Sequence, residues 1–203
     1  MKKGVILLVV LFIISVFGYS QNLENLDYVS PLHDGLIAIK KDTNWGFINK
    51  EGNMVINFRN DLVTTKSDDG EYPVFKNGRC LITKETNGIL YFGYIDATGK
   101  TVIEPQFLNA SNFINNEALA LHVMKNEIGK NDVLAIKMVS YRYHEVIIDS
   151  NGEIKEYLTP KGFSIVLDKK YLKIPPKITS KRITDRMYAV VNESKKWSIV
   201  KIN

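Results

Sequence analysis

The chain has 203 residues, a formal net charge of +5 and 45% hydrophobic residues, enough for one domain of ordinary size with its own hydrophobic core. The charge is mild and evenly scattered, which argues against a nucleic-acid-binding protein. A single cysteine, Cys80, excludes an intramolecular disulfide. It lies in an apolar run, so we expect a buried hydrophobic side chain rather than a catalytic thiol.

The N-terminus has the three features of a signal peptide. Lys2 and Lys3 precede an apolar run that continues to Phe17, and the small residues Gly18 and Ser20 follow it. We therefore expect residues 1–20 to be removed and the mature chain to begin at Gln21. The alternative is an uncleaved anchor, but a spanning helix needs about 20 apolar residues, more than this run supplies. No cysteine lies near the cleavage point, which excludes attachment by a lipoprotein route.

This prediction gives residues 21–203 as one exported domain. Loss of Lys2 and Lys3 lowers its formal net charge from +5 to +3. We expect no membrane span after cleavage, and a location in the periplasm, at the cell surface or in the medium.

Residues 45–56 predict a β-hairpin. Phe47 and Ile48 close one apolar strand, residues 49–52 form a four-residue turn, and the return strand starts at Met54. Asn49 at the first turn position is suited to bond the backbone ahead of it. Gly52 at the fourth accepts the left-handed conformation that a type I turn with a bulge requires.

The same hairpin returns twice. Asp96 and Gly99 bound the second turn, and Asp149 and Gly152 bound the third, so the turn glycines are 47 and 53 residues apart. Such spacing is typical of repeat proteins.

Each hairpin also has an apolar strand before it, at residues 35–41, 78–84 and 117–123, and a fourth such strand, 186–191, precedes a turn at 192–195 and a last strand from Trp197. Three short antiparallel strands cannot bury their apolar face alone, but stacked copies can. We therefore predict an all-β fold of tandem three-stranded antiparallel repeats stacked as an open array, with a closed propeller-like ring as the alternative. The units are about 29–59, 72–107, 110–157 and 183–203. The third contains an insertion, 124–142, that reads as strand or short helix.

The first two units resemble the WG-repeat family of bacterial proteins, whose motif is roughly Trp-Gly-Phe-Ile-Asp-x-x-Gly-x-x-Val-Ile-x-Pro-x-Tyr. Trp45 and Gly46 open the first copy, whereas Phe92 and Gly93 open the second, with Phe in place of Trp. The third copy has Glu145-Val146 at that point, and the fourth retains Trp197. The resemblance implies a β-rich repeat fold in an exported protein, a binding or scaffold role and no known catalysis.

Two connectors between units carry charge. Residues 57–71 include Asp68 and Asp69 but lack the alternating carboxylates of a calcium loop, so we predict a solvated turn. Residues 157–182 are basic and contain Pro175-Pro176. Contact with anionic polysaccharide or lipid is one interpretation, and protection of a sheet edge is the one that we favour.

The sequence contains no recognisable catalytic or cofactor motif, so we predict no enzyme, no cofactor and no metal site. Asp96 and Asp149 recur because of turn chemistry, since Asn49 takes the same place. His122 and His144 approach each other only if the insertion folds back as a hairpin, and two histidines without a third ligand make a weak metal site.

The motif residues are predicted to be structural; they are Trp45, Gly46, Gly52, Phe92, Gly93, Gly99, Gly152 and Trp197. Trp45, Phe92 and Trp197 occupy one equivalent position, and we expect them to pack between successive units rather than to form an exposed row that binds sugar rings. The predicted function is a non-catalytic binding or scaffold module at the cell envelope, with an unknown protein or glycan partner. The alternative is an exported enzyme or carbohydrate-binding protein that acts on polysaccharide. The sequence does not define the oligomeric state.

Overall fold

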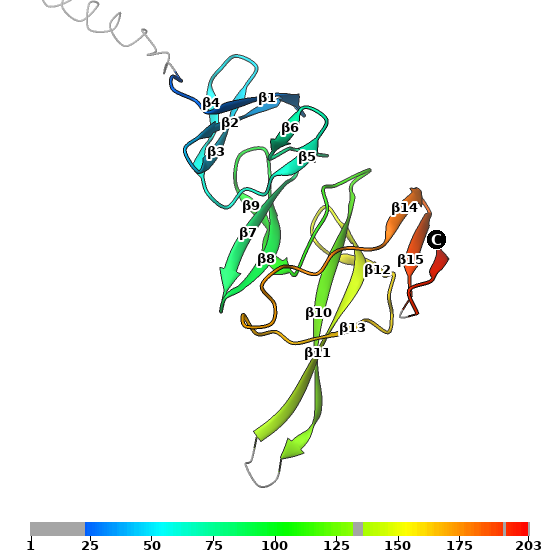
Figure 1. Ribbon diagram of the computed structural model, residues 1–203. Coiled ribbons are helices and arrows are strands. Elements are labelled where there is room, and N and C mark those ends of the chain that lie inside the picture. The colour runs from blue at the N-terminus through cyan, green and yellow to red at the C-terminus, as the bar shows by residue number, and fades with distance from the viewer. Residues whose placement is uncertain (1–22, 132–135, 193, 203) are drawn as a thin grey trace, which may run out of the picture.

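The computed structural model describes residues 23–131, 136–192 and 194–202 (Figure 1). The predicted signal peptide, residues 1–20, and the expected first mature residue, Gln21, lie outside this range. The described residues form strands β1 to β16 and no helix. They therefore contain no helix that could cross a membrane.

Four antiparallel sheets of three or four strands follow one another along the chain, and a fifth, two-stranded sheet lies between the first two in sequence. The first sheet contains β1 (Tyr28–His33), β2 (Leu36–Lys41), β3 (Asn44–Asn49) and β4 (Met54–Arg59). The second contains β7 (Cys80–Thr86), β8 (Ile89–Ile95) and β9 (Thr101–Phe107). The third contains β10 (Glu117–Asn131), β11 (Ile136–Asp149), β12 (Ile154–Tyr157) and β13 (Phe163–Ile165). The fourth contains β14 (Lys181–Thr184), β15 (Met187–Val191) and β16 (Trp197–Lys201). None of the sheets closes, and the fourth lies apart from the first (Figure 1), which confirms the all-β open array and not the ring.

The strand count departs from three per unit in two places. β1 adds a fourth strand to the first sheet, and β13 pairs with the outer part of β11 in the third. The insertion at 124–142 is strand and not helix in its described part, because β10 and β11 continue through it as one long hairpin (Figure 1). β13 comes from the basic connector and covers an edge of β11.

In the connector at 57–71, residues 66–69 are exposed, as expected for a solvated turn, but the connector is otherwise more ordered than we expected. It contains the hairpin of β5 (Thr65–Ser67) and β6 (Gly70–Tyr72). Tyr72 is fully buried, and its hydroxyl donates to Asp69 at 2.8 Å, while the Tyr28 hydroxyl donates to the Asp69 carbonyl oxygen at 3.2 Å. The two tyrosine rings stack, with centroids 5.7 Å apart. This hairpin therefore packs on the first sheet through aromatic side chains, a contact that could not be predicted from the sequence of the connector.

The core repeats along the array. Alternate side chains of a strand point to opposite faces of its sheet, so each unit has a front face, defined in the first unit by Ala38, Trp45 and Phe47, and a back face, defined there by Ile37, Ile39 and Ile48. The front face of each of the first three units packs on the back face of the next. The back-face residues in these clusters are Cys80, Ile82 and Ile95 of the second unit, Ala118, Ala120 and Ile148 of the third, and Tyr188, Val190 and Val200 of the fourth. Burial of Cys80 in the first of these interfaces confirms its prediction as a buried hydrophobic side chain.

Candidate functional site

The glycine of the Trp-Gly pair gives space to the neighbouring strand. A Cβ at position 46 would lie 3.0 Å from the carbonyl oxygen of Ile56 on β4. A Cβ at position 93 would overlap the carbonyl oxygen of Ile103 and lie 2.6 Å from the nitrogen of Pro105 on β9. The register shifts opposite both glycines, as expected for β-bulges. The space that a Cβ at position 46 would fill is therefore occupied by the bulged return strand and not by the indole ring of Trp45.

The predicted turns are confirmed in atomic detail. Asn49 Oδ1 accepts hydrogen bonds from the backbone N–H groups two and four residues later, at 3.1 and 2.9 Å, and the Asp96 and Asp149 carboxylates accept the same pair. The fourth residue is left-handed in each turn, with φ of +83° at Gly52, +86° at Gly99 and +84° at Gly152. A hydrogen bond from the Thr98 hydroxyl, helped by backbone N–H groups, lowers the pKa of Asp96. Asp96 and Asp149 are thus turn residues and not a catalytic pair.

Two of these turns also join neighbouring units. A Cβ on Gly99 would meet the Ile56 side chain of the first unit at 3.3 Å, and one on Gly152 would meet Ile103 of the second at 2.8 Å. Arginines of the preceding units bond the same turns, because Arg59 Nη1 donates to the Gly99 carbonyl oxygen and Arg79 donates to that of Ser150. A Cβ on Gly52, in the first unit, would meet nothing within 4 Å. The turn of one unit therefore rests on the return strand of the unit before it.

The aromatic position of the motif differs in each unit. Trp45 and Phe92 are each 8% exposed and belong to the interfaces between units, as predicted. The Trp45 and Tyr28 rings pack in a T-shaped arrangement with centroids 5.8 Å apart, and Lys40 Nζ lies 5.7 Å from the centroid of the Trp45 ring.

In the third unit, Glu145 takes the aromatic position and is fully buried. Its carboxylate accepts hydrogen bonds from the N–H and the hydroxyl of Thr179 and from the N–H of Ser180, at 2.7 to 2.8 Å. It therefore ties the basic connector to β11. Its place in the Trp-Gly position was visible in the sequence, but its partners, some 35 residues later, were not.

Trp197 corrects the prediction for the fourth unit. The register pairs Val191 with Trp197 and Ala189 with Ile199, which places both on the front face of the fourth sheet, where they are equivalent to Trp45 and Phe47. Trp197 is nevertheless 54% exposed and Ile199 is 58% exposed, because no further sheet among the described residues covers this face. Lys181 Nζ lies 5.2 Å from the Trp197 ring centroid. Trp197 is thus exposed and not a staple between units.

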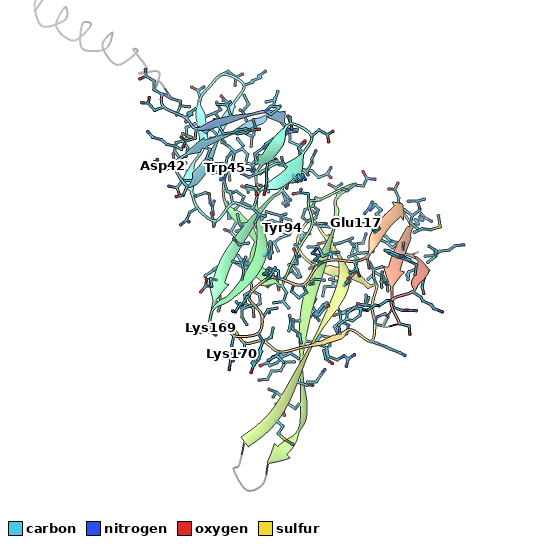
Figure 2. The ribbon with its side chains drawn as sticks, in the orientation of Figure 1. Asp42, Trp45, Tyr94, Glu117, Lys169 and Lys170 are labelled. Atoms are coloured by element: carbon cyan, nitrogen blue, oxygen red, sulfur yellow. The ribbon has the colours of Figure 1, made fainter. Side chains whose placement is uncertain are left out.

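A salt-bridge cluster joins the third and fourth units. Glu117 accepts from Arg182 Nη2 at 2.6 Å and from Lys155 Nζ at 2.8 Å, and its label in Figure 2 lies beside the fourth sheet. Burial raises the pKa of Glu117, but the hydrogen bond from Lys155 and the two positive charges outweigh burial and lower it. Both carboxylate oxygens of Glu117 have a basic partner, so we interpret the cluster as a structural contact.

His122 and His144 face each other across β10 and β11, as the fold-back of the insertion requires. The Tyr157 ring lies nearly perpendicular to both histidine rings, and His144 Nδ1 lies 2.9 Å from the carbonyl oxygen of Thr159. Burial and, to a lesser degree, His144 lower the pKa of His122. Within the described residues, no group of three or more His, Cys, Asp or Glu side chains is placed to hold a metal ion. Burial raises the pKa of Cys80, which disfavours a reactive thiolate.

Comparison with protein families agrees with this geometry. The family model of the WG containing repeat matches residues 45–64 and 92–121. These segments include the bulge glycines, the first two turns and the return strands β4 and β9. No curated protein and no solved structure matches the chain. These two segments are therefore similar to the WG containing repeat. The later units are identified from the equivalent strands and faces described above.

Proposed function

We propose that this chain is an exported, non-catalytic binding module of the cell envelope, and that the front face of the fourth unit holds a partner protein. One observation supports this most directly. The front faces of the first three units are covered by the next sheet, whereas Trp197 and Ile199 of the fourth are more than half exposed. A face built for sheet packing remains open, and exposed apolar patches of this kind mark interaction sites.

The chemistry of the partner follows from the three packed interfaces. Their back faces consist of apolar side chains such as Cys80, Ala120 and Val190. The partner should therefore present an apolar β-sheet face. Lys181 and Lys201 are exposed on the fourth sheet, so acidic residues at the rim of the partner's face would complement it. Trp197 would be the central anchor, since buried tryptophans dominate binding energy at interfaces.

Carbohydrate binding at the same face is the alternative, and the exposed indole of Trp197 is the observation that favours it. It would be a single aromatic contact and not a row, because Trp45 and Phe92 are buried. Lys181 already lies over the Trp197 ring. The sheet-docking proposal uses Ile199 as well, whereas a stacked sugar ring does not need it.

Site-specific photo-crosslinking tests the proposal. A photoreactive amino acid replaces Ile199 in the exported protein, and the matched control replaces Val55, which is exposed on the first sheet. We expect a discrete protein adduct in intact envelopes from position 199 and not from position 55. The captured protein is then purified, and Trp197→Ser should weaken its binding by at least tenfold, as expected for an anchor worth about 2 kcal/mol.

Other outcomes have separate meanings. An adduct with the chain itself, together with dimers in light scattering, would identify a second copy as the partner. A glycan that protects Trp197 from quenching, with no protein adduct, would support the carbohydrate alternative. Turnover of a polysaccharide that survives changes on the front face but fails on a single carboxylate substitution would contradict a non-catalytic module.

Export is part of the proposal and rests on residues 1–20. N-terminal sequencing of the exported protein should find Gln21 first. Recovery of a membrane-retained chain that begins at Met1 would contradict it.

A further inference from the structure

The connector between β13 and β14 exposes large apolar side chains among lysines. Ile174 is 78% exposed and Tyr171 is 69% exposed. Lys169, Lys170 and Lys173 lie between and beside them and are also exposed. Folding leaves these two apolar side chains in water, so burial within the chain does not account for them.

The backbone that carries them is firmly held. Asp168 accepts backbone hydrogen bonds from residues 170, 171 and 172, which forms a tight turn. Leu172 points inward and packs in a cluster with Leu108 and Leu121 of the body. Further along, Asn109 Nδ2 donates to the Pro176 carbonyl oxygen at 2.8 Å, and Glu145 holds residues 179 and 180. The exposed side chains therefore stand on an anchored loop.

The loop tip lies against the turn between β7 and β8. The Lys169 side chain reaches within 2.8 Å of where a Cβ of Gly88 would be, and Figure 2 shows Lys169 and Lys170 at this edge of the molecule. Between residues 166 and 177 the loop has four lysines and one acidic residue, Asp168. On the neighbouring strand β7, the opposite charges of Lys84 and Glu85 offset each other. The loop tip, defined here as residues 168–174, is thus positively charged with two apolar side chains projecting from it.

We propose that the loop tip binds the surface of an anionic lipid bilayer. Tyr171 and Ile174 would enter the interfacial region, where a tyrosine ring and an aliphatic side chain both gain from leaving water. Lys169, Lys170 and Lys173 would contact the anionic headgroups. A hydrated anionic polysaccharide would satisfy the lysines but offers nothing to an isoleucine, so the combination favours lipid. This surface is separate from the front face of the fourth unit, and either can fail without the other.

A fluorescent reporter on the loop tests this directly. Cys80 is fully buried, so the Ile174→Cys variant can be labelled at its new thiol with an environment-sensitive dye. The matched control is Val29→Cys, on the first sheet, where the native side chain is 55% exposed. With vesicles of phosphatidylcholine and phosphatidylglycerol, we expect a blue shift at position 174 and none at position 29. Vesicles of phosphatidylcholine alone should give little shift at either position.

The control position also guards against the apolar N-terminal segment. Any binding through that segment would bring position 29 closest to the bilayer. A shift at position 29 equal to that at 174, or no shift at 174, would overturn the proposal. So would an equal shift at 174 with dextran sulfate, a soluble polyanion, in place of vesicles.

A charge-matched pair of variants tests the lysines. Lys169→Gln with Lys170→Gln should lower the vesicle partition coefficient about thirtyfold, whereas Lys50→Gln with Lys66→Gln, which removes the same charge elsewhere, should lower it much less. Thermal melts verify that both variants are folded. Equal losses in the two variants would show that net charge alone causes the binding and would overturn a specific role for the loop tip.

Discussion

Gly93 lies directly against the main chain of the neighbouring strand, so close that a methyl group at this position would overlap the carbonyl oxygen of Ile103. Gly46 has the same relationship with Ile56, at a looser 3.0 Å. Neither glycine has a positive φ, so the requirement is for space and not for an unusual backbone conformation. The glycine of the Trp-Gly pair is thus explained by the bulge that it faces.

This relationship predicts an order of damage. Gly93→Ala should destabilise the protein by about 1 to 3 kcal/mol or more, because only backbone atoms can move to admit the methyl group, and Gly46→Ala should cost less. Urea denaturation of both variants measures the two losses. A stable Gly93→Ala variant would mean that the bulge at Pro105 can shift freely.

The turn glycines predict a second comparison. Gly52 and Gly152 have nearly the same φ, so an alanine at either pays a similar strain of about 1 to 3 kcal/mol. Only Gly152 also rests on a neighbouring unit, with Ile103 Cγ2 2.8 Å from the added Cβ. Gly152→Ala should therefore lose more stability than Gly52→Ala in the same urea titration. Equal losses would show that the contact between units yields without cost.

Within one turn, the acid and the glycine should differ sharply. Asp96→Asn should change stability little at neutral pH, because Asn49 makes the same two backbone bonds in the first unit. Gly99→Val should cost about 1 to 3 kcal/mol, since a β-branched residue is strained at φ +86°. Chemical denaturation of the two variants decides the matter, and comparable losses would contradict this assignment of the turn.

The sequence predicted these turns because their signals are local. The Asn or Asp at the first position accepts hydrogen bonds from backbone N–H groups within the turn. The Gly at the fourth position sets the backbone conformation of the same turn. The fourth unit has a similar turn without glycine. Asn192 Oδ1 accepts a hydrogen bond from the backbone N–H four residues later, and Lys195, at φ +58°, stands in the place of glycine.

What the sequence did not predict depends on distant contacts. Glu145 stands where the motif has an aromatic residue, and only the fold brings Thr179 and Ser180 to its carboxylate. Trp197 matches Trp45 in position, but its burial depends on whether another sheet packs on it. The positive charge of the basic connector was evident from its sequence. That Leu172 is packed inward while Ile174 is exposed depends on how the fold anchors the loop.

The histidine pair predicts a pH dependence. The pKa of His122 is lowered by burial and then by His144, so the unfolded chain binds a proton more readily than the folded one. The stability that depends on neutral His122 is complete above its ordinary pKa of 6.5 and is lost as the pH falls from that value through the lowered one. His122→Phe, which keeps a ring beside Tyr157, should flatten this part of the stability curve. Urea midpoints across the pH range and the NMR titration of His122 check it, and an NMR pKa at or above 6.5 would contradict it.

The two tryptophans, which hold one motif position in different units, should behave in opposite ways. Trp45→Ala removes a ring packed among Tyr28, Phe47 and the second unit, and should cost about 3 to 5 kcal/mol. Trp197→Ala removes a ring that is already more than half exposed, so its cost should be within about 0.5 kcal/mol, as for ordinary surface positions.

Fluorescence gives an independent measurement, because the chain has only these two tryptophans. Trp197→Phe should leave a blue-shifted emission from Trp45 that iodide quenches poorly, and Trp45→Phe should leave a red-shifted, readily quenched emission from Trp197. A quencher-accessible Trp45 together with an unchanged melting temperature in Trp45→Ala would contradict its structural role. It would revive the carbohydrate-binding interpretation for Trp45.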